Sequence, residues 1–171
     1  MSVTKRQVQA LILGWLAMLG WDFLLHGGFL AQHYLGESQF LLPPKHAFQL
    51  IPLGYLSFLL NAILILWISK RFEITSWKKA LTFGLTLGFL SWCAFVLGLI
   101  SISTIEIPLA LGWIIGQTLE IGIGALVIYL ALQAQSLRKL SIYIILFISL
   151  AFVLTIILQN IGVAPAVVLS Q

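Results

Sequence analysis

The sequence predicts an all-α integral membrane protein, a five-transmembrane-helix bundle formed by one domain over residues 1–171. Three observations predict this fold class. The chain is 61% hydrophobic and only 8% charged, whereas a soluble domain carries about 25% charged residues. Five apolar stretches are each long enough to cross a bilayer core, which takes about 20 helical residues. The basic residues collect in alternate connections between those stretches.

The predicted spans cover residues 8–30, 48–69, 80–102, 108–132 and 140–161. Helices are expected because the apolar runs are long and continuous, whereas a strand of a membrane barrel has about 10 residues of alternating polarity. The three connections that follow the second span are short, so consecutive helices should lie antiparallel and side by side. The longest connection, residues 31–47, contains the helix-breaking pair Pro43-Pro44, and the sequence leaves open whether this connection is helical.

The distribution of basic residues predicts how the bundle is oriented. Eight of them fall on one side of the predicted bundle: Lys5, Arg6, Lys70, Arg71, Lys78, Lys79, Arg138 and Lys139. Only Lys45 falls on the other side. Basic residues favour the cytoplasmic side, which predicts a cytoplasmic N-terminus and an external C-terminus in the cytoplasmic (inner) membrane. Contact of the basic residues with lipid head groups explains the net charge of +4. The expected partner is therefore the lipid bilayer, and no nucleic-acid partner is expected.

Ionisable residues within the first span are candidates for function, because such a group costs about 2.5–3.5 kcal/mol near the centre of a span. With about 100° of rotation per residue, Asp22, His26, His33 and Glu37 would share one face of a continuous helix. The glycine pair at 27–28 could interrupt that helix. A carboxylate one turn from an imidazole can orient the ring, so the face suits the binding or transfer of protons.

A metal site is a weaker interpretation of the same region. His33 and Glu37 have the i,i+4 spacing that places two ligands on one ion, and the following connection could add His46. No established metal-binding motif is present, so the sequence assigns no metal. It identifies no cofactor either, because no phosphate-binding loop or EF-hand motif is found.

The predicted fourth span carries the second carboxylate of the membrane interior. Four positions of one face are spaced by four residues: Gly112, Gly116, Glu120 and Gly124. Small residues allow another helix to approach closely, so Glu120 should face protein. Gln117 lies one turn outward. Asp22 and Glu120 differ in depth by about one helical turn, which allows a shared polar pocket in the outer half of the bundle, with Asn61 of the second span at similar depth.

Glycine faces also suggest contacts with other membrane proteins. Gly84 and Gly88 form a small-residue face in the third span, and Gly112, Gly116 and Gly124 form one in the fourth. Such faces pack closely against other helices. They are expected to pack within the bundle, against a second copy of the chain, or against other membrane subunits.

The segment Gly20-Trp21-Asp22-Phe23-Leu24-Leu25-His26-Gly27, followed by Tyr34, resembles the first span of certain small bacterial membrane proteins of unknown function. In those families an aromatic residue and an aspartate near the outer end of the first span precede a tyrosine. The Trp-Ile-Ile-Gly-x-x-x-Glu pattern of the fourth span is similar to a later element of the same proteins. The resemblance implies a small multi-span membrane protein, and it supplies no activity and no catalytic residue.

Four functions are compatible with these patterns. The favoured one is a module that binds or conducts a small molecule, an ion or protons through a polar pocket lined by Asp22, His26, Gln117 and Glu120. The second is an accessory subunit of a larger membrane complex, in which the polar groups serve only helix packing. The third is a membrane-embedded enzyme that uses Asp22 or Glu120 as a general acid or base on a lipid-soluble substrate. The fourth, a pigment or quinone carrier, requires a histidine deep within a span.

Overall fold

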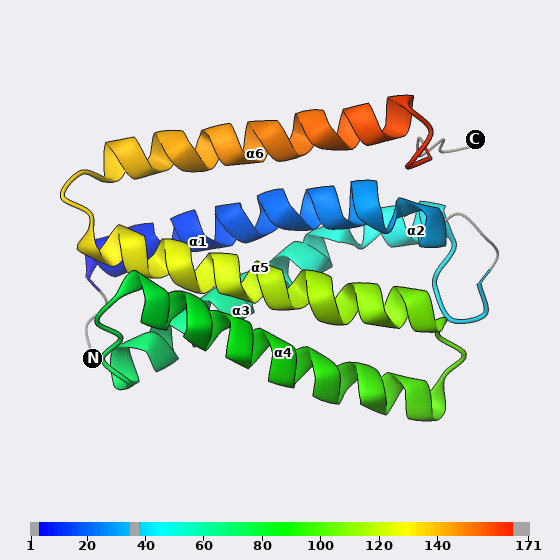
Figure 1. The fold of residues 1–171 in the computed structure, drawn as a ribbon, viewed down its shortest axis with the longest axis horizontal. Coiled ribbons are helices and arrows are strands. Elements are labelled where there is room, and N and C mark those ends of the chain that lie inside the picture. The colour runs from blue at the N-terminus through cyan, green and yellow to red at the C-terminus, as the bar shows by residue number, and fades with distance from the viewer. Residues whose placement is uncertain (1–3, 35–37, 166–171) are drawn as a thin grey trace.

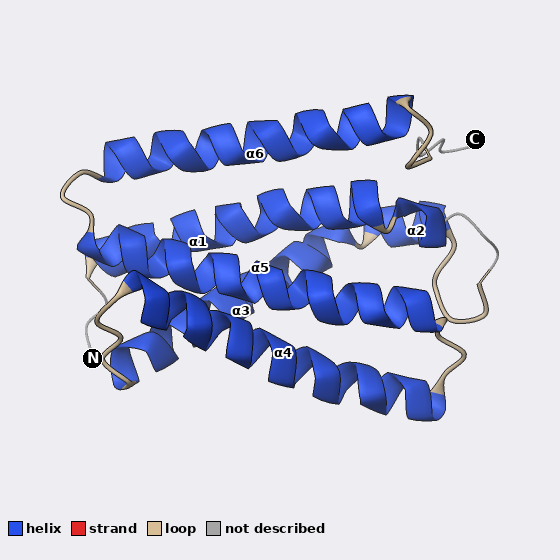
Figure 2. Ribbon diagram, viewed as in Figure 1, coloured by secondary structure: helices blue, strands red, loops and turns tan. Residues whose placement is uncertain are grey.

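The computed structural model describes residues 4–34 and 38–165, and helices are the only regular elements within them. Figures 1 and 2 show the long helices lying roughly along one direction. In chain order the elements are α1 (Lys5–Leu24), a π-helical turn η1 (Leu25–Phe29), a 3-10 turn η2 (Ala31–Tyr34), α2 (Pro44–Gln49), α3 (Ile51–Arg71), α4 (Trp77–Ile102), α5 (Ile107–Gln133) and α6 (Leu137–Asn160).

Five of these helices are long and apolar enough to cross a membrane, the first of them running from Lys5 to Phe29 through the π-turn. Every predicted span matches one of them, with boundaries no more than three residues apart. Helices α1 and α4 begin before the predicted spans because polar residues cap their N-termini. The Thr4 side chain accepts from the backbone N–H of Gln7, and the Ser76 side chain accepts from that of Lys79. Capping of this kind satisfies N–H groups that an apolar run cannot.

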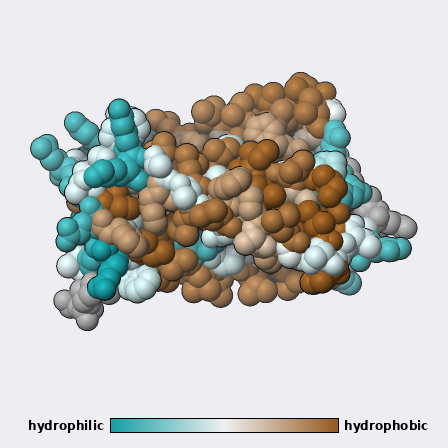
Figure 3. Space-filling view, turned by 60° about the horizontal axis from the view of Figure 1, so that its bottom comes forward, coloured by the Kyte–Doolittle hydropathy of each residue, from teal (hydrophilic) through white to brown (hydrophobic). Residues whose placement is uncertain are grey.

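The surface of the bundle matches an apolar surrounding. Figure 3 shows a broad hydrophobic band across the middle of the molecule with hydrophilic side chains at both ends. Long apolar side chains such as Leu60 of α3 and Leu97 of α4 are exposed. One end, called the basic end below, carries all the basic residues except Lys45, because α1, α4 and α6 begin there and α3 ends there.

Helix α5 is the centre of the bundle. It packs along α4 and α1 and also contacts α3, whereas α6 packs mainly against α1. More than half of the apolar window of α5 is buried, compared with 11% for α3 and α4. The polar side chains of α5 therefore face other helices of the same chain.

Glycines permit the close packing around α5. A Cβ at Gly84 of α4 would lie 2.8 Å from the Ile121 carbonyl oxygen, and one at Gly88 would lie 2.9 Å from the Thr118 Cα. On the opposite side of α5, three glycines are covered by the first span: Gly112 by Leu30, Gly116 by Leu25 and Gly124 by Met18. Both glycine faces that the sequence offered to a second copy or another subunit are thus packed within this chain.

The glycine pair at 27–28 widens the first helix and does not end it. Residues 25–29 form the π-turn, in which the Leu30 N–H donates to the Leu25 carbonyl at 2.8 Å. A Cβ at Gly28 would lie 3.0 Å from the Leu158 side chain, so the wide turn packs directly against α6. The sequence left open whether the connection over residues 31–47 is helical. The structure places the turn η2 and the start of the short helix α2 in it.

Substitution of Gly84 tests the α4–α5 contact. Gly84→Ala is expected to lower the free energy of unfolding by about 1–3 kcal/mol, because the added methyl group has no free space in a packed interface. Leu90→Ala on the same helix is the control, since that side chain is 61% exposed. It should change the stability by no more than about 0.5 kcal/mol. Unfolding by SDS in mixed micelles, followed by circular dichroism, measures both, and equal losses would contradict the packing described.

Candidate functional site

The polar side chains of the first span and of α5 meet between these two helices. Asp22 lies in the last turn of α1, and its Oδ1 is 3.1 Å from Nε2 of His26 one turn later. The Gln117 side-chain nitrogen, on α5, lies 3.3 Å from the same ring nitrogen. Asp22 and His26 are both largely shielded, with 14% and 31% of their side chains exposed. Three of the residues that the sequence singled out are therefore brought together.

Two aromatic residues extend this group toward the end opposite the basic end. Nδ1 of His26 lies 2.5 Å from the Tyr34 hydroxyl, and the Trp113 indole N–H donates to that hydroxyl at 2.9 Å. Tyr34 belongs to the turn η2, just beyond the first span. Burial raises the pKa of its hydroxyl far above the ordinary value, an effect that the Trp113 hydrogen bond partly offsets. The Tyr34 hydroxyl therefore stays protonated and can donate a hydrogen bond.

The chemistry of these groups favours one direction for the hydrogen bonds. An indole N–H can only donate, so the Tyr34 oxygen accepts from Trp113 and directs its own proton at Nδ1 of His26. The neutral imidazole then carries its proton on Nε2, which lies 3.1 Å from Asp22 Oδ1. The Gln117 side chain fits this arrangement with its amide oxygen, in place of its nitrogen, turned toward that N–H. The other tautomer would place a ring lone pair against a carboxylate oxygen. The contacts form a polar chain from Trp113 through Tyr34 and His26 to Asp22.

Glu120 lies beside this chain at the centre of α5, thirteen residues from each end of the helix. Its side chain is completely buried, and neither carboxyl oxygen has a hydrogen-bond partner. Asp22 lies close enough for the two carboxylates to interact electrostatically. Gln117 is also near Glu120. Asp22 Oδ1 and Gln117 Oε1 are likewise buried without a hydrogen-bond partner, although Asp22 Oδ1 lies 3.1 Å from His26 Nε2.

The π-turn explains why the predicted face of the first helix is only partly right. A π-helical turn holds one residue more than an α-turn, so the residue that returns to His26 is Tyr34 and not His33. His33 lies instead 3.7 Å from the exposed Glu106 carboxylate, at the start of α5. Glu37 lies outside the described residues.

The described residues contain no cluster of ligands that would support the metal site considered from the sequence. Within residues 4–34 and 38–165, no three histidine, cysteine or acidic side chains gather closely enough to hold a metal ion. His46 lies on the exposed surface of α2.

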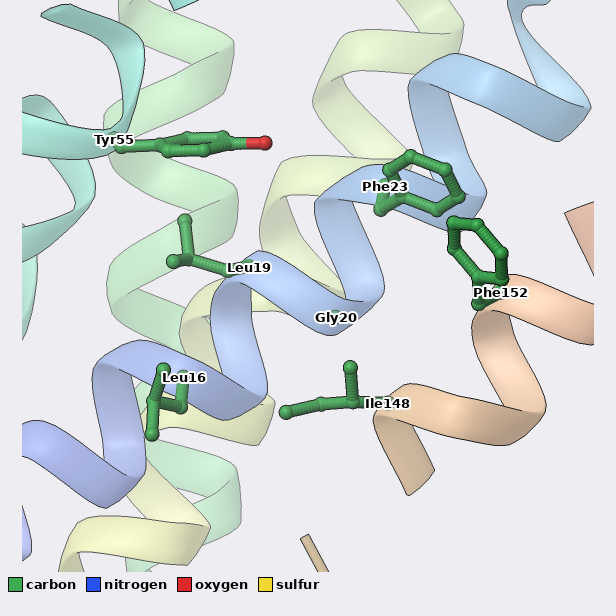
Figure 4. A pocket seen from close by; sticks show the side chains of 7 residues that line it. All are labelled: Leu16, Leu19, Gly20, Phe23, Tyr55, Ile148 and Phe152. Atoms are coloured by element: carbon green, nitrogen blue, oxygen red, sulfur yellow. The ribbon is translucent and has the colours of Figure 1, made fainter. Parts of the chain in front are cut away.

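Asn61 does not join the polar chain. It lines a second feature, a groove of about 280 Å³ between α3 and α4 with α5 as its floor. Another groove of about 270 Å³, between α3 and α6, is almost entirely apolar and lies over α1. Figure 4 shows the Tyr55 hydroxyl pointing into this groove toward Phe23, which stacks on Phe152 with 5.0 Å between the ring centroids.

Three aromatic members of the site are not among the candidate residues predicted from the sequence. Tyr34 and Trp113 complete the polar chain, and the Trp21 indole donates to the Gly116 carbonyl at 2.8 Å, which ties the first span to α5. One signal was available, because Trp113 lies four residues before Gln117 and so shares its face of α5. Nothing in the pattern places Tyr34, whose position depends on the π-turn.

Comparisons of the chain with protein-family models, with curated proteins and with solved structures find no match.

Removal of the Tyr34 hydroxyl tests the polar chain. Tyr34→Phe leaves the Trp113 N–H and a nitrogen of His26 without their partner, so it is expected to lower the free energy of unfolding by about 1–3 kcal/mol. Tyr143→Phe is the control, because that side chain is 66% exposed on α6, and it should be nearly neutral. SDS unfolding in mixed micelles measures both variants. A Tyr34→Phe variant as stable as the control would show that the hydroxyl is not a bonded member of the chain.

Proposed function

We propose that the protein is a multi-pass protein of the cytoplasmic membrane that binds and transfers protons in the outer half of the bilayer. Asp22, His26 and Glu120 take up and release the protons, and Tyr34 relays them. The basic end faces the cytoplasm, because basic residues flanking spans are retained on that side. The N-terminus then lies inside and the C-terminus outside, and Tyr34 lies at the external end of the polar chain.

The observation that carries the proposal is the series of close polar contacts that runs from Tyr34 through His26 to Asp22. Each group in it can both give and accept a proton in one of its states. The Tyr34 hydroxyl is at hydrogen-bond distance from the ring, 2.5 Å, and Asp22 Oδ1 lies 3.1 Å from the other ring nitrogen, where a small rotation of either side chain aligns the two groups for transfer. Protons need only such contacts, whereas a small molecule needs a cavity, and the two grooves described above are lined by other residues.

The unpartnered carboxyl group of Glu120 supports the same function. An ionised carboxylate in the interior of a membrane bundle is costly unless another group compensates its charge. No cation side chain is paired with Glu120 among the described residues, and the region lacks the ligand cluster of a metal site. A proton is the simplest compensating group. Asp22 lies nearby, so a proton on one carboxyl group affects the charge state of the other.

A purely structural polar cluster would have a different form. Buried polar groups that serve only packing are normally hydrogen-bonded, and each exception needs an explanation. Four buried oxygen atoms of Asp22, Gln117 and Glu120 have no partner. Unfilled bonding capacity at this point of the bundle favours the exchange of protons or water over packing alone.

Difference infrared spectroscopy of the protein in nanodiscs tests the proposal. The carboxyl bands are followed between about pH 4 and pH 9, a range that includes the ordinary titration of carboxyl and imidazole groups. Glu120→Gln is expected to remove one band, and Asp22→Asn is expected to move the midpoint of that band by about one pH unit or more. The physical reason is that the charge of Asp22 acts on the buried carboxyl group of Glu120.

Glu106→Gln is the matched control, since Glu106 is an exposed carboxylate at the end of the bundle. It should leave the Glu120 band in place. If no Glu120 band changes with pH and both inner substitutions only lower the thermal stability, the polar cluster serves packing, and an accessory role in a larger membrane complex replaces the proposal.

A further inference from the structure

The groove between α3 and α4 differs from the remaining apolar surface because polar side chains line it in the middle of the bundle. Both helices pack on α5, and the groove runs between them. Asn61 lies ten residues from either end of α3. Ser57, Ser91 and Trp92 join it in the lining, among apolar neighbours such as Leu64 and Phe95.

The amide of Asn61 has the largest unused hydrogen-bonding capacity of these groups, since Ser91 and Trp92 each carry a single polar atom. Ser57 satisfies its hydroxyl within its own helix by donating to the Gly54 carbonyl at 2.8 Å. Asn61 is half-buried and open to the groove, and no hydrogen bond reaches its side chain from the described residues. An amide carries two N–H donors and a carbonyl acceptor. In the middle of a bilayer neither water nor an acyl chain supplies their partners, so another polar group must.

We propose that this groove is the contact surface between two copies of the chain, with Asn61 of each copy hydrogen-bonded to Asn61 of the other. The groove lining carries no charged side chain, so it offers nothing to a charged partner helix. An amide is instead complementary to itself, because each can donate to the carbonyl of the other. A two-fold axis brings the same residue of both copies together, and asparagine is a known determinant of pairing between membrane helices.

The space around the groove fits the approach of another helix. A Cβ at Gly54 of α3 or at Gly98 of α4 would meet nothing within 4 Å. Gly54 lies seven residues before Asn61 and Gly98 seven residues after Ser91, so each glycine shares the face of its groove residue. These glycines are open, unlike Gly84 and Gly88, which are packed against α5.

Cysteine crosslinking of the full chain in membranes tests the contact. Cys93 is the only cysteine, so Cys93→Ser provides the background. In that background Ser57→Cys, with Asn61 retained, is expected to form a disulfide dimer under mild oxidation, at twice the 19.0 kDa mass of the chain. Ile63→Cys is the matched control on the same helix, because its side chain is 45% exposed and points about 160° away from Asn61. It should remain monomeric.

Substitutions of Asn61 show whether the dimer yield depends on the amide, which distinguishes a specific contact from random collisions between chains. Adding Asn61→Leu to Ser57→Cys should lower the dimer yield about tenfold, as expected for the loss of an interhelical hydrogen bond. Adding Asn61→Gln, which keeps an amide, should largely restore it. SDS unfolding confirms that each variant folds. A folded Ser57→Cys chain that stays monomeric, a yield unchanged by Asn61→Leu, or a crosslinked band of another mass would overturn the proposal. None of these outcomes bears on the titration of Glu120.

Discussion

The close contact between the first span and α5 is the constraint on which the rest of the structure depends. Gly112, Gly116 and Gly124 bring α5 against the side chains of Leu30, Leu25 and Met18. The removal of three side chains lets the backbones approach, and dispersion contacts over that length stabilise helices in lipid, where no hydrophobic force acts between them. The same approach brings the Gly116 carbonyl within reach of the Trp21 indole.

This contact also determines the chemistry of the site. Glu120 occupies the position between Gly116 and Gly124 on the glycine face, so the approach of the first span buries its carboxyl group completely. It lies near Asp22 and its neighbour His26, while the π-turn returns Tyr34 to the other side of the imidazole. A bundle that served packing alone would be more stable with an apolar residue at position 120, because an unpaired buried carboxyl group is costly. Its presence in the close contact between the first span and α5 is what points to function.

The sequence predicts the five long helices well and the site only in part. Long apolar runs identify all five helices because the requirement to span a bilayer acts on each run independently. The spacing of Asp22 and His26, and of Gln117 and Glu120, places these residues on faces that do meet. Asn61 shows the limit, because depth along a helix says nothing about the direction in which a side chain points. Tyr34 shows another, since one π-turn shifts the register of every residue that follows it.

The direction of the polar chain is the central claim, and the tautomer of His26 tests it most directly. The protein has three histidines, so replacing His33 and His46 with glutamine leaves His26 as the only one. With ¹⁵N-labelled histidine at neutral pH, nuclear magnetic resonance should show the proton on Nε2 and Nδ1 as an acceptor, and Tyr34→Phe should remove that preference. A proton found on Nδ1, or a spectrum that Tyr34→Phe leaves unchanged, would contradict the account.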